Sequence, residues 1–344
     1  MKAVVFHGPD DVRVEDAPEP VLPRGGLIVR PRTVGICGSD IRTWHTGNHR
    51  IRGTQILGHE MAGVVMDSDD ERYPAGMAVA ICPCFPCLEC EYCQAGIQNF
   101  CPRRECLGYQ HPGGMAEALA IPAGSIRAGG VVPVPETVPL DLAPLAEPLH
   151  TVLNGQDRAH PSPSESVLVL GLGPIGILHA AVARSRGVAS VLGVDPVPER
   201  VSRAAAILGP GHTLAMGSGW EEQAQRQIGG KGWDLVVVAT ASPAAVLTAM
   251  SLVGPLGRVL AFAGLPADAP SVAIDWNRVH YGQIQIIGAF GGTPAYFRKA
   301  VNWLATSGVE LDKLVTTEVP LERALEAFEA VQRGVGLKTM IRIS

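Results

Sequence analysis

The sequence predicts an α/β protein of two domains, in which a partly barrel-like β domain accompanies a six-stranded, doubly wound parallel sheet. Three observations lead to this fold class. The chain has 344 residues, which suggests about two domains rather than one core. Up to about His150 it places short apolar segments between turns rich in Pro and Gly. From Ser166 onward, continuous apolar strands alternate with helical patterns, which is typical of a parallel sheet covered on both faces.

The first part of the chain carries short strand patterns whose spacing favours a compact β domain. We expect these strands at residues 4–6, 27–34, 63–66, 78–81 and 115–121. Helical patterns cover residues 39–46 and 139–155.

The second part alternates strands and helices and fits the doubly wound fold that binds dinucleotides. Its six strands are expected at residues 166–170, 189–195, 212–215, 234–239, 258–263 and 284–289, and its helices at 177–186, 197–208, 220–228 and 243–253. From Gly291 we expect helix and then a final strand, T-M-I-R-I-S, which returns to the first domain without a further parallel β-α-β unit. The expected domains are therefore 1–155 with 291–344, and 156–290.

Composition excludes several classes of partner. The chain is 47% hydrophobic and 18% charged, as a globular enzyme is. Its net charge of −5 gives no electrostatic reason to bind nucleic acid or an anionic membrane. The longest apolar run, residues 167–183, is broken by glycines and is shorter than a membrane span of about 20 residues. The N-terminus lacks the pattern of a signal peptide, so we expect a cytoplasmic protein.

A thiol, an imidazole and a carboxylate occur in one stretch between Gly35 and Gly63. They belong to Cys37, His59 and Glu60. Zinc prefers these ligand types, and a catalytic zinc commonly takes three protein ligands and leaves a fourth position open. We therefore expect Cys37 and His59 to bind a catalytic metal.

A second metal site is expected in one short loop. Four cysteines there have the spacing C-x2-C-x2-C-x7-C, which is typical of a closed, tetrahedral structural zinc site. They are Cys87, Cys90, Cys93 and Cys101.

The chain has eight cysteines in all, which in a cytoplasmic protein favour metal or redox chemistry over disulfides. Three of them, Cys82, Cys84 and Cys106, fall outside both metal patterns. We expect these to be small apolar or surface thiols, with Cys84 as an alternative ligand of the structural site.

A dinucleotide site is expected between the first strand and helix of the second part. Gly171, Gly173 and Gly176 form G-x-G-x-x-G with Pro174 and Ile175 inside it. The glycines permit a tight turn, close approach of a pyrophosphate and close packing of helix on strand. The phosphate then lies at the positive end of the helix.

The next strand ends at Asp195, whose carboxylate can accept hydrogen bonds from the ribose hydroxyls and repel a 2′-phosphate. NAD is therefore favoured over NADP. Arg200 is the one feature that softens this preference, and a turn-forming role before Pro196 is the alternative for Asp195.

With these sites placed, the sequence resembles the zinc-dependent medium-chain alcohol and polyol dehydrogenases over nearly its whole length. The closest similarity is to the sorbitol, threonine and sugar or cyclitol dehydrogenase branch. The resemblance implies a GroES-like catalytic domain, a Rossmann domain that binds NAD, and two zinc ions. The motifs are G-I-C-G-S-D at 35–40, G-H-E at 58–60, the four-cysteine loop, P-G-G-M-A-E at 112–117, A-E-P-L at 146–149 and G-L-G-P-I-G at 171–176.

The resemblance also implies roles for particular residues. Glu60 or Glu147 supplies the third protein ligand of the catalytic zinc, and the sequence does not choose between them. Ser39 corresponds to the hydroxyl that passes the alcohol proton outward. Many members then have His five residues after the zinc cysteine, but this chain has Arg42 there, which cannot act as a base. His45, one helical turn further on, is the candidate substitute, and a solvated histidine without a catalytic role is the alternative.

Other residues are expected to border the substrate or the cofactor. Trp44, His45 and His111 are placed at the substrate pocket, and Thr151, Ala289 and Phe290 near the nicotinamide. The resulting function is NAD-dependent oxidation of a secondary alcohol on a polyol, sugar, cyclitol or hydroxy amino acid, by a homo-oligomer (tetramer or dimer). The alternatives are a threonine 3-dehydrogenase type of activity and an inactive, zinc-stabilised binding protein of the same fold.

Overall fold

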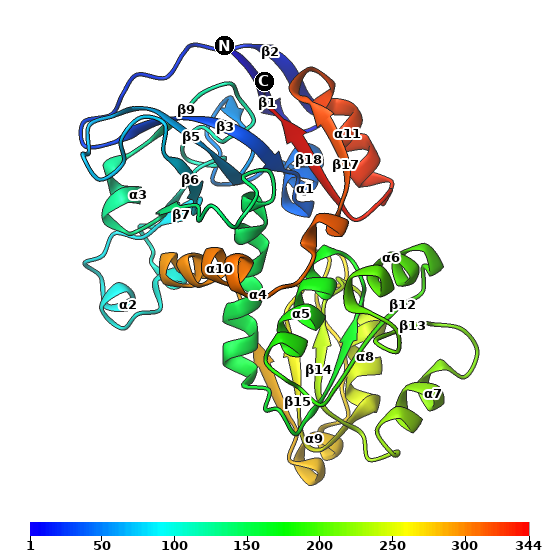
Figure 1. Ribbon diagram of the computed structural model, residues 1–344. Helices are drawn as coiled ribbons and strands as arrows, with labels where there is room; N and C mark the ends of the chain where they lie inside the picture. The colour runs from blue at the N-terminus through cyan, green and yellow to red at the C-terminus, as the bar shows by residue number, and fades with distance from the viewer. Residues whose placement is uncertain (344) are drawn as a thin grey trace. The chain divides into compact units, whose positions relative to one another are not determined.

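The structure is a computed structural model that describes residues 1–343, and these form two compact units (Figure 1). Unit 1 contains Met1–His150, Gly292–Gly308 and the chain from Val315 to the C-terminus. Unit 2 contains Thr151–Gly291 and Val309–Leu314. No helix within residues 1–343 is both long and apolar enough to cross a membrane.

Unit 1 is built on a seven-stranded sheet, with two smaller sheets beside it. The main sheet has the order β10 (Val131–Pro133), β6 (Ala78–Ile81), β5 (Glu60–Ser68), β3 (Leu27–Gly35), β18 (Lys338–Arg342) and β17 (Val315–Pro320), and β9 (Leu119–Ile121) also pairs with β3. The smaller sheets are β2 (Asp11–Asp16), β1 (Lys2–Gly8) and β4 (Gln55–Ile56), and the pair β7 (Cys84–Phe85) and β8 (Glu105–Cys106).

Unit 1 also contains helices. They are α1 (Gly38–Thr46), α2 (Glu91–Gln94), α3 (Ala123–Arg127), α10 (Pro294–Thr306) and α11 (Ala324–Gln332), with 3-10 turns η1 (Gln98–Phe100), η2 (Ala143–Leu145) and η4 (Leu321–Arg323). The helix expected from Pro139 begins only at η2 and continues as α4 (Ala146–Ala159). Pro144 lacks an N–H group and is tolerated only in a first turn, so the regular helix begins after it.

The C-terminal segment corrects one expectation. Its last strand, β18, returns to unit 1 as expected and pairs antiparallel with β3. However, β18 also pairs in parallel with β17, and α11 connects the two strands. The chain therefore does form a further parallel β-α-β unit, which the sequence pattern did not show because β17 is largely half-buried and carries three consecutive polar residues.

Unit 2 contains the six-stranded parallel sheet that the sequence predicts. Its order is β13 (Thr213–Ala215), β12 (Ser190–Asp195), β11 (Ser166–Leu170), β14 (Trp233–Val238), β15 (Val253–Ala261) and β16 (Gln285–Gly288), with all neighbours parallel. The helices are α5 (Pro174–Ser185), α6 (Pro198–Leu208), α7 (Trp220–Gln227), α8 (Pro243–Leu252) and α9 (Trp276–Gly282), with the 3-10 turn η3 (Leu311–Leu314). Helix α9 was not expected; Asp275 caps it by accepting hydrogen bonds from the amides of Asn277 and Arg278.

The central strands of the unit 2 sheet are buried along most of their length. All five residues of β11 are buried, as are most of β12 and β14, so both faces of the sheet are covered. At the start of β11, the carboxylate of Asp234 accepts hydrogen bonds from the Ser166 amide (2.8 Å) and hydroxyl (2.7 Å). This side-chain contact ties the ends of the two central strands together.

The turn from β11 into α5 needs glycine at two positions. Gly171 has a φ of 98°, which is in the left-handed region that favours glycine. A Cβ on Gly176 would collide with the carbonyl oxygen of Gly171, whereas a Cβ on Gly173 would meet no atom within 4 Å. The three glycines of one motif therefore have different physical roles.

This difference yields a stability prediction. Gly176→Ala should destabilise unit 2 by about 1–3 kcal/mol, because the new methyl group forces helix and strand apart. Gly173→Ala, the matched control, should leave the midpoint of thermal unfolding nearly unchanged. Differential scanning calorimetry of the two variants checks this, and equal midpoints would contradict the packing role of Gly176.

Candidate metal centres and nucleotide site

The main sheet brings Cys37, His59 and Glu60 together. In the antiparallel pairing of β3 with β5, Gly35 lies opposite Glu60. Cys37 follows two residues beyond Gly35 as the N-cap of α1, and His59 immediately precedes β5. The ligand atoms of the three side chains lie within 4.8 Å of one another. Glu147 is not part of this group among the described residues.

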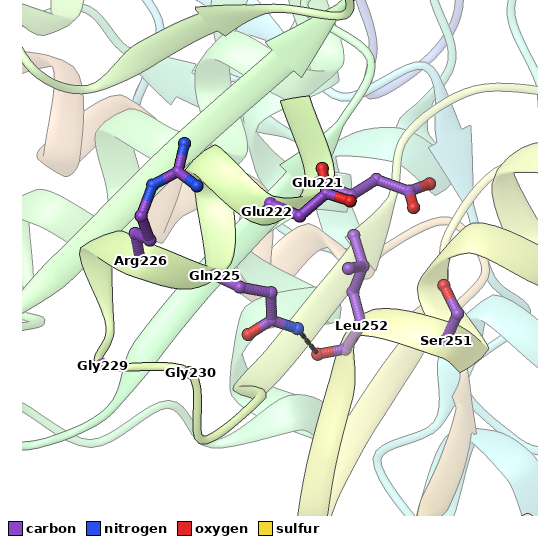
Figure 2. Close-up of a pocket in the computed structure, with 8 residues that line it drawn as sticks. All are labelled: Glu221, Glu222, Gln225, Arg226, Gly229, Gly230, Ser251 and Leu252. Atoms are coloured by element: carbon purple, nitrogen blue, oxygen red, sulfur yellow. Dashed lines mark hydrogen bonds between the residues drawn. The ribbon is translucent and has the colours of Figure 1, made fainter. Parts of the chain in front are cut away.

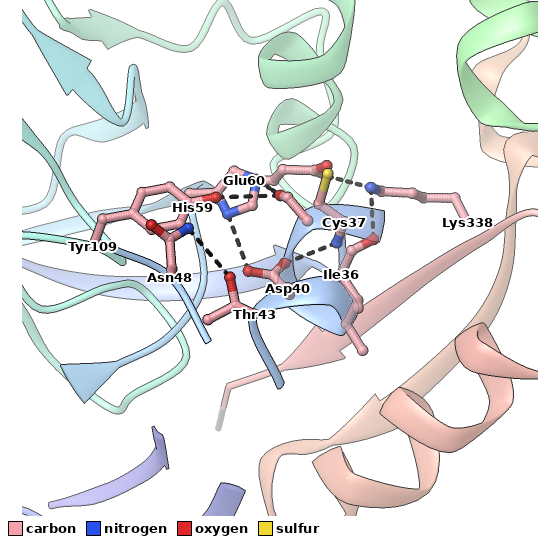
Figure 3. Close-up of polar contacts among 10 residues, drawn as sticks. Ile36, Cys37, Asp40, Thr43, Asn48, His59, Glu60, Tyr109 and Lys338 are labelled. Carbon is pink, nitrogen blue, oxygen red and sulfur yellow. Dashed lines mark hydrogen bonds and ion pairs between the residues drawn. The ribbon is translucent and has the colours of Figure 1, made fainter. Parts of the chain in front are cut away.

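The carboxylate of Asp40 orients two of these groups (Figure 3). Its Oδ2 accepts a hydrogen bond from the Cys37 amide at 2.9 Å, and its Oδ1 lies 3.1 Å from Nδ1 of His59. Since a carboxylate only accepts, Nδ1 carries the hydrogen and the lone pair of Nε2 remains for a metal. A carboxylate behind the imidazole in this way is typical of zinc sites.

The electrostatics of the group fit a cation. Burial pushes the pKa of His59 down, but Asp40 and Tyr109 outweigh burial, and the pKa lies well above 6.5. The groups around the imidazole, Asp40 above all, therefore favour a positive charge at this place. The thiol, imidazole and carboxylate donors are those that zinc prefers. The donor set and the charge around it therefore fit a zinc ion.

Glu60 has a buried counter-ion that the sequence analysis missed. Its Oε2 forms an ion pair with Nζ of Lys338, which also donates to the carbonyl oxygen of Ile36 at 2.9 Å (Figure 3). Gly35 leaves space for this pair, because a Cβ there would collide with Glu60 Oε2. Lys338 is only 4% exposed. The signal available in the sequence was one lysine at the start of the final strand, directly before T-M-I-R.

Glu147 lies in the first turn of α4. Burial raises the pKa of its carboxyl group to about 7, although His59 opposes the shift. The next turn of the same helix carries His150, whose Nδ1 contacts the carbonyl oxygen of Glu147 and whose pKa burial lowers to about 4. A buried carboxyl group with such a pKa takes up or releases a proton near neutral pH.

Of the expected polar residues Ser39, His45 and His111, Ser39 is the one that contacts His59. The Ser39 hydroxyl is 3.3 Å from His59 Nε2. His45 Nδ1 lies 2.6 Å from the Asp10 carboxylate, its ring stacks on Trp44, and no hydrogen bond joins it to Ser39 within residues 1–343. His111 is half-exposed, with Nε2 2.9 Å from the Glu105 carboxylate.

Tyr109, which the sequence analysis did not single out, donates a hydrogen bond to Ser39 Oγ at 3.2 Å. It lies two residues before His111 in the polar loop that precedes the P-G-G motif. An aromatic residue with a hydroxyl in that loop was the one signal that could have indicated it.

The four loop cysteines converge as a closed site. Their sulfur atoms lie within 4.8 Å of one another, and three of the pairs are 3.5 Å, 3.5 Å and 3.9 Å apart. The edge of a tetrahedron with Zn–S bonds of about 2.3 Å is about 3.8 Å. Hydrogen bonds from the backbone, first that of Glu89, lower the pKa of Cys87 to about 6, which favours the thiolate that zinc binds. The four sulfurs therefore have the spacing that a zinc ion requires.

The other three cysteines correct an expectation. Cys84 and Cys106 form a disulfide across the β7–β8 pair, so they are not free thiols and Cys84 is not a ligand of the structural site. The two residues are paired only because β7 and β8 pair, and local spacing does not show that pairing. Cys82 is a buried thiol, as expected, and burial raises its pKa to about 12.

In unit 2, the carboxylate of Asp195, at the end of β12, contacts the backbone of the glycine turn. Its Oδ2 accepts from the Leu172 amide and its Oδ1 from the Val197 amide, both at 2.8 Å. Arg200 Nη1 lies 3.9 Å from the same carboxylate. Thr151 is in α4 and Ala289 follows β16, where its amide donates to Ala261. Phe290 is 61% exposed.

Unit 2 also has an open hollow of about 590 Å³ beside α7 (Figure 2). None of its lining residues belongs to the metal groups or to the glycine motif. The residues are Glu221, Glu222, Gln225, Arg226, Gly229, Gly230, Ser251 and Leu252.

Comparisons with known proteins agree with this geometry. Residues 23–136 match the family model described as alcohol dehydrogenase GroES-like domain, and residues 174–306 match the one described as zinc-binding dehydrogenase. D-xylulose reductase A of Aspergillus oryzae is 30% identical over 98% of this chain and 95% of its own length. Erythritol/L-threitol dehydrogenase of Mycolicibacterium smegmatis is 28% identical over 100% of this chain and 97% of its own.

A solved structure shares the fold. It is a zinc-binding dehydrogenase of Sinorhizobium meliloti bound to NADP, which superimposes with a TM-score of 0.90 at 24% identity over 99% of this chain and 98% of its own. The chain thus belongs to the zinc-dependent medium-chain alcohol and polyol dehydrogenases, a family of NAD(P)-linked oxidoreductases. The predicted GroES-like and Rossmann fold class is confirmed.

The metal content is predicted by two groups of candidate ligands, namely the Cys37–His59–Glu60 group and the four-cysteine loop. Purified protein should contain about two zinc ions per chain. Cys93→Ser should remove one and lower the midpoint of thermal unfolding, whereas Cys37→Ala should remove the other with little effect on that midpoint. Cys82→Ala is the matched control and should keep both ions. Inductively coupled plasma mass spectrometry measures this, and a wild-type content well below two would count against the pair of sites.

Proposed function

We propose that the protein oxidises a secondary alcohol of a polyol, sugar, cyclitol or hydroxy amino acid to a ketone and transfers the hydride to NAD. The observation that carries this proposal is the group Cys37, His59 and Glu60, whose donor atoms lie within 4.8 Å, with the Ser39 hydroxyl beside Nε2 of His59. The polyol chemistry named for the two relatives supports the substrate class.

In this proposal, Cys37 and His59 hold a catalytic zinc, and Glu60 or Glu147 supplies the third ligand. Zinc, when bound, supplies a Lewis acid that polarises the substrate oxygen. Glu60 is already beside Cys37 and His59, while Lys338 competes for its carboxylate. Glu147 is the alternative ligand: burial raises the pKa of its carboxyl group, and a cation bound nearby would favour the charged form. Cys87, Cys90, Cys93 and Cys101 hold the structural zinc.

Ser39 and His45 are proposed to transfer the proton of the alcohol. We assign Ser39 as the hydroxyl that contacts the substrate oxygen, because it lies next to the metal-facing nitrogen of His59. His45 is retained as the candidate for the outer proton acceptor, since its pairing with Asp10 orients the imidazole as a base requires.

The cofactor site is proposed in unit 2. Gly171, Gly173 and Gly176, with Pro174 and Ile175, would hold the pyrophosphate at the N-terminus of α5. Asp195 would accept from the ribose, and Arg200 lies beside it. Thr151, Ala289 and Phe290 are proposed near the nicotinamide. In this assignment, residues 1–155 and 291–344 form the catalytic domain and residues 156–290 the NAD-binding domain.

We also propose that the chain forms a homo-oligomer, a dimer or tetramer, in the cytoplasm. Strand β16 is an edge of the parallel sheet, and Ile286 on this strand is 49% exposed. An exposed, apolar edge strand offers unpaired backbone groups to a second copy of the chain. Phe290, just beyond the strand, adds apolar surface.

The central test is a panel of polyols, cyclitols and hydroxy amino acids assayed for NADH formation at 340 nm. Cys37→Ala should lower kcat/KM for the best substrate by about a thousandfold or more, because it removes the ligand of a Lewis acid that contributes several kcal/mol. Cys82→Ala should behave as wild type. A zinc-loaded wild-type protein that oxidises no alcohol would overturn the proposed function.

Cofactor choice is tested separately. Asp195→Ala should lower the ratio of kcat/KM for NAD to that for NADP by about tenfold or more, because the charge that repels a 2′-phosphate is lost. Because Asp195 also holds the amides of Leu172 and Val197, the unfolding midpoint is measured alongside the ratio. A ratio that stays at its wild-type value in a folded variant would remove the assigned role.

A further inference from the structure

The Ser39 hydroxyl has two hydrogen-bonding partners within residues 1–343. One is Nε2 of His59 at 3.3 Å, and the other is the hydroxyl of Tyr109, which donates to Ser39 Oγ at 3.2 Å. A serine hydroxyl has one hydrogen and two lone pairs, so its contacts limit where its hydrogen can point. Tyr109 occupies one of the lone pairs.

The position of Tyr109 is fixed by its backbone. The amide of Tyr109 donates to the carbonyl oxygen of Cys106, and its own carbonyl oxygen accepts from Gln55 Nε2 at 2.9 Å. Cys106 is itself tied to Cys84 through the disulfide. The preceding Gly108 has a φ of 80°, which favours glycine. The loop therefore presents Tyr109 in one orientation.

The ring of Tyr109 is held on its faces as well. It stacks against His59 with ring centroids 5.6 Å apart and an angle of 29° between the planes. The guanidinium carbon of Arg50 lies 3.8 Å from the ring centroid, where the cation is attracted by the π electrons. Tyr109 is only 6% exposed. Its hydroxyl therefore has little freedom to turn away from Ser39.

If Nε2 of His59 binds the metal, the Ser39 hydrogen has no acceptor among residues 1–343. Tyr109 fills a lone pair of Ser39 as a donor, so that hydrogen is directed away from Tyr109. This hydrogen is then available to an oxygen of a substrate that binds beside Ser39. A hydrogen bond aimed at an oxygen that becomes negative during the reaction is worth most when its donor is held in advance.

We propose that Tyr109 is a positioning residue: by donating to Ser39 Oγ, it holds the Ser39 hydrogen toward the substrate oxygen. This inference rests on the proposed function, because it takes the substrate oxygen to lie beside Ser39. In many relatives a histidine lies five residues after the zinc cysteine, but this chain has Arg42 there. The nearby His45 contacts Asp10. The contact of Tyr109 with Ser39 would be a feature particular to this chain.

The test is a double-mutant cycle in the zinc-loaded, full-length protein. Tyr109→Phe should lower kcat/KM for the alcohol by about three- to tenfold, the effect of one hydrogen bond. Ser39→Ala should lower it by about a hundredfold. Because Tyr109 acts through Ser39, adding Tyr109→Phe to Ser39→Ala should change the rate by less than about twofold. KM for NAD should be unchanged throughout.

Tyr73 provides the matched control. Its hydroxyl also makes a buried hydrogen bond, to the carbonyl oxygen of Val131 at 3.1 Å, in the same unit. Tyr73→Phe removes an equivalent interaction and should leave kcat/KM within about twofold of wild type, whatever it does to the unfolding midpoint. This control separates the loss of a buried hydroxyl from the loss of the contact to Ser39.

A binding measurement gives a readout that does not depend on turnover. Gluconamide, whose unreactive amide oxygen stands in for a ketone oxygen, is titrated into the enzyme–NADH complex and followed by NADH fluorescence. Its dissociation constant should rise by about three- to tenfold in Tyr109→Phe and should show the same lack of additivity with Ser39→Ala.

The outcomes are distinct. If Tyr109→Phe lowers kcat/KM as much in the Ser39→Ala background as in wild type, the inference is overturned. It is also overturned if Tyr109→Phe alone has the kinetics and the gluconamide binding of wild type. A wild-type protein that oxidises no alcohol would instead overturn the proposed function, and the binding cycle would then decide the role of Tyr109 alone.

Discussion

The carboxylate of Asp40 is the interaction on which the metal centre of unit 1 depends. One side chain accepts hydrogen bonds from the backbone of Cys37 and from the imidazole of His59, and so joins the end of β3 to the start of β5. Because Asp40 is 2% exposed, water does not compete for either bond. The orientation of the thiol, the tautomer of the imidazole and the place of Ser39 beside Nε2 all follow from this single group.

A second constraint is charge balance among three adjacent strands. Glu60 is on β5, the space beside it comes from Gly35 on β3, and its counter-ion Lys338 is on β18. A buried ion pair contributes little net stability because both charges lose their hydration, but removing one partner would leave an unpaired charge at high cost. The pair therefore acts mainly to hold the carboxylate of Glu60 in one place within the sheet.

Local patterns predicted much of this protein, and long-range contacts account for what they missed. The four zinc cysteines and the glycine motif lie within short loops, so spacing alone indicated their sites. Tyr109, Lys338 and the Cys84–Cys106 disulfide depend on which strands pair and in what register, and a one-dimensional pattern does not carry that information. His45 shows the same limit, because only the fold reveals that Asp10 engages it. The β17–α11–β18 unit was missed because its first strand is only half-buried.

The location of Lys338 has a consequence for the order in which the protein matures. Strand β18 lies between β3 and β17, so the main sheet of unit 1 stays incomplete until the residues that form unit 2 have been synthesised. Until then, Glu60 lacks the lysine with which it forms its buried ion pair. A strand that follows all of unit 2 in the sequence therefore supplies the positive charge beside Glu60.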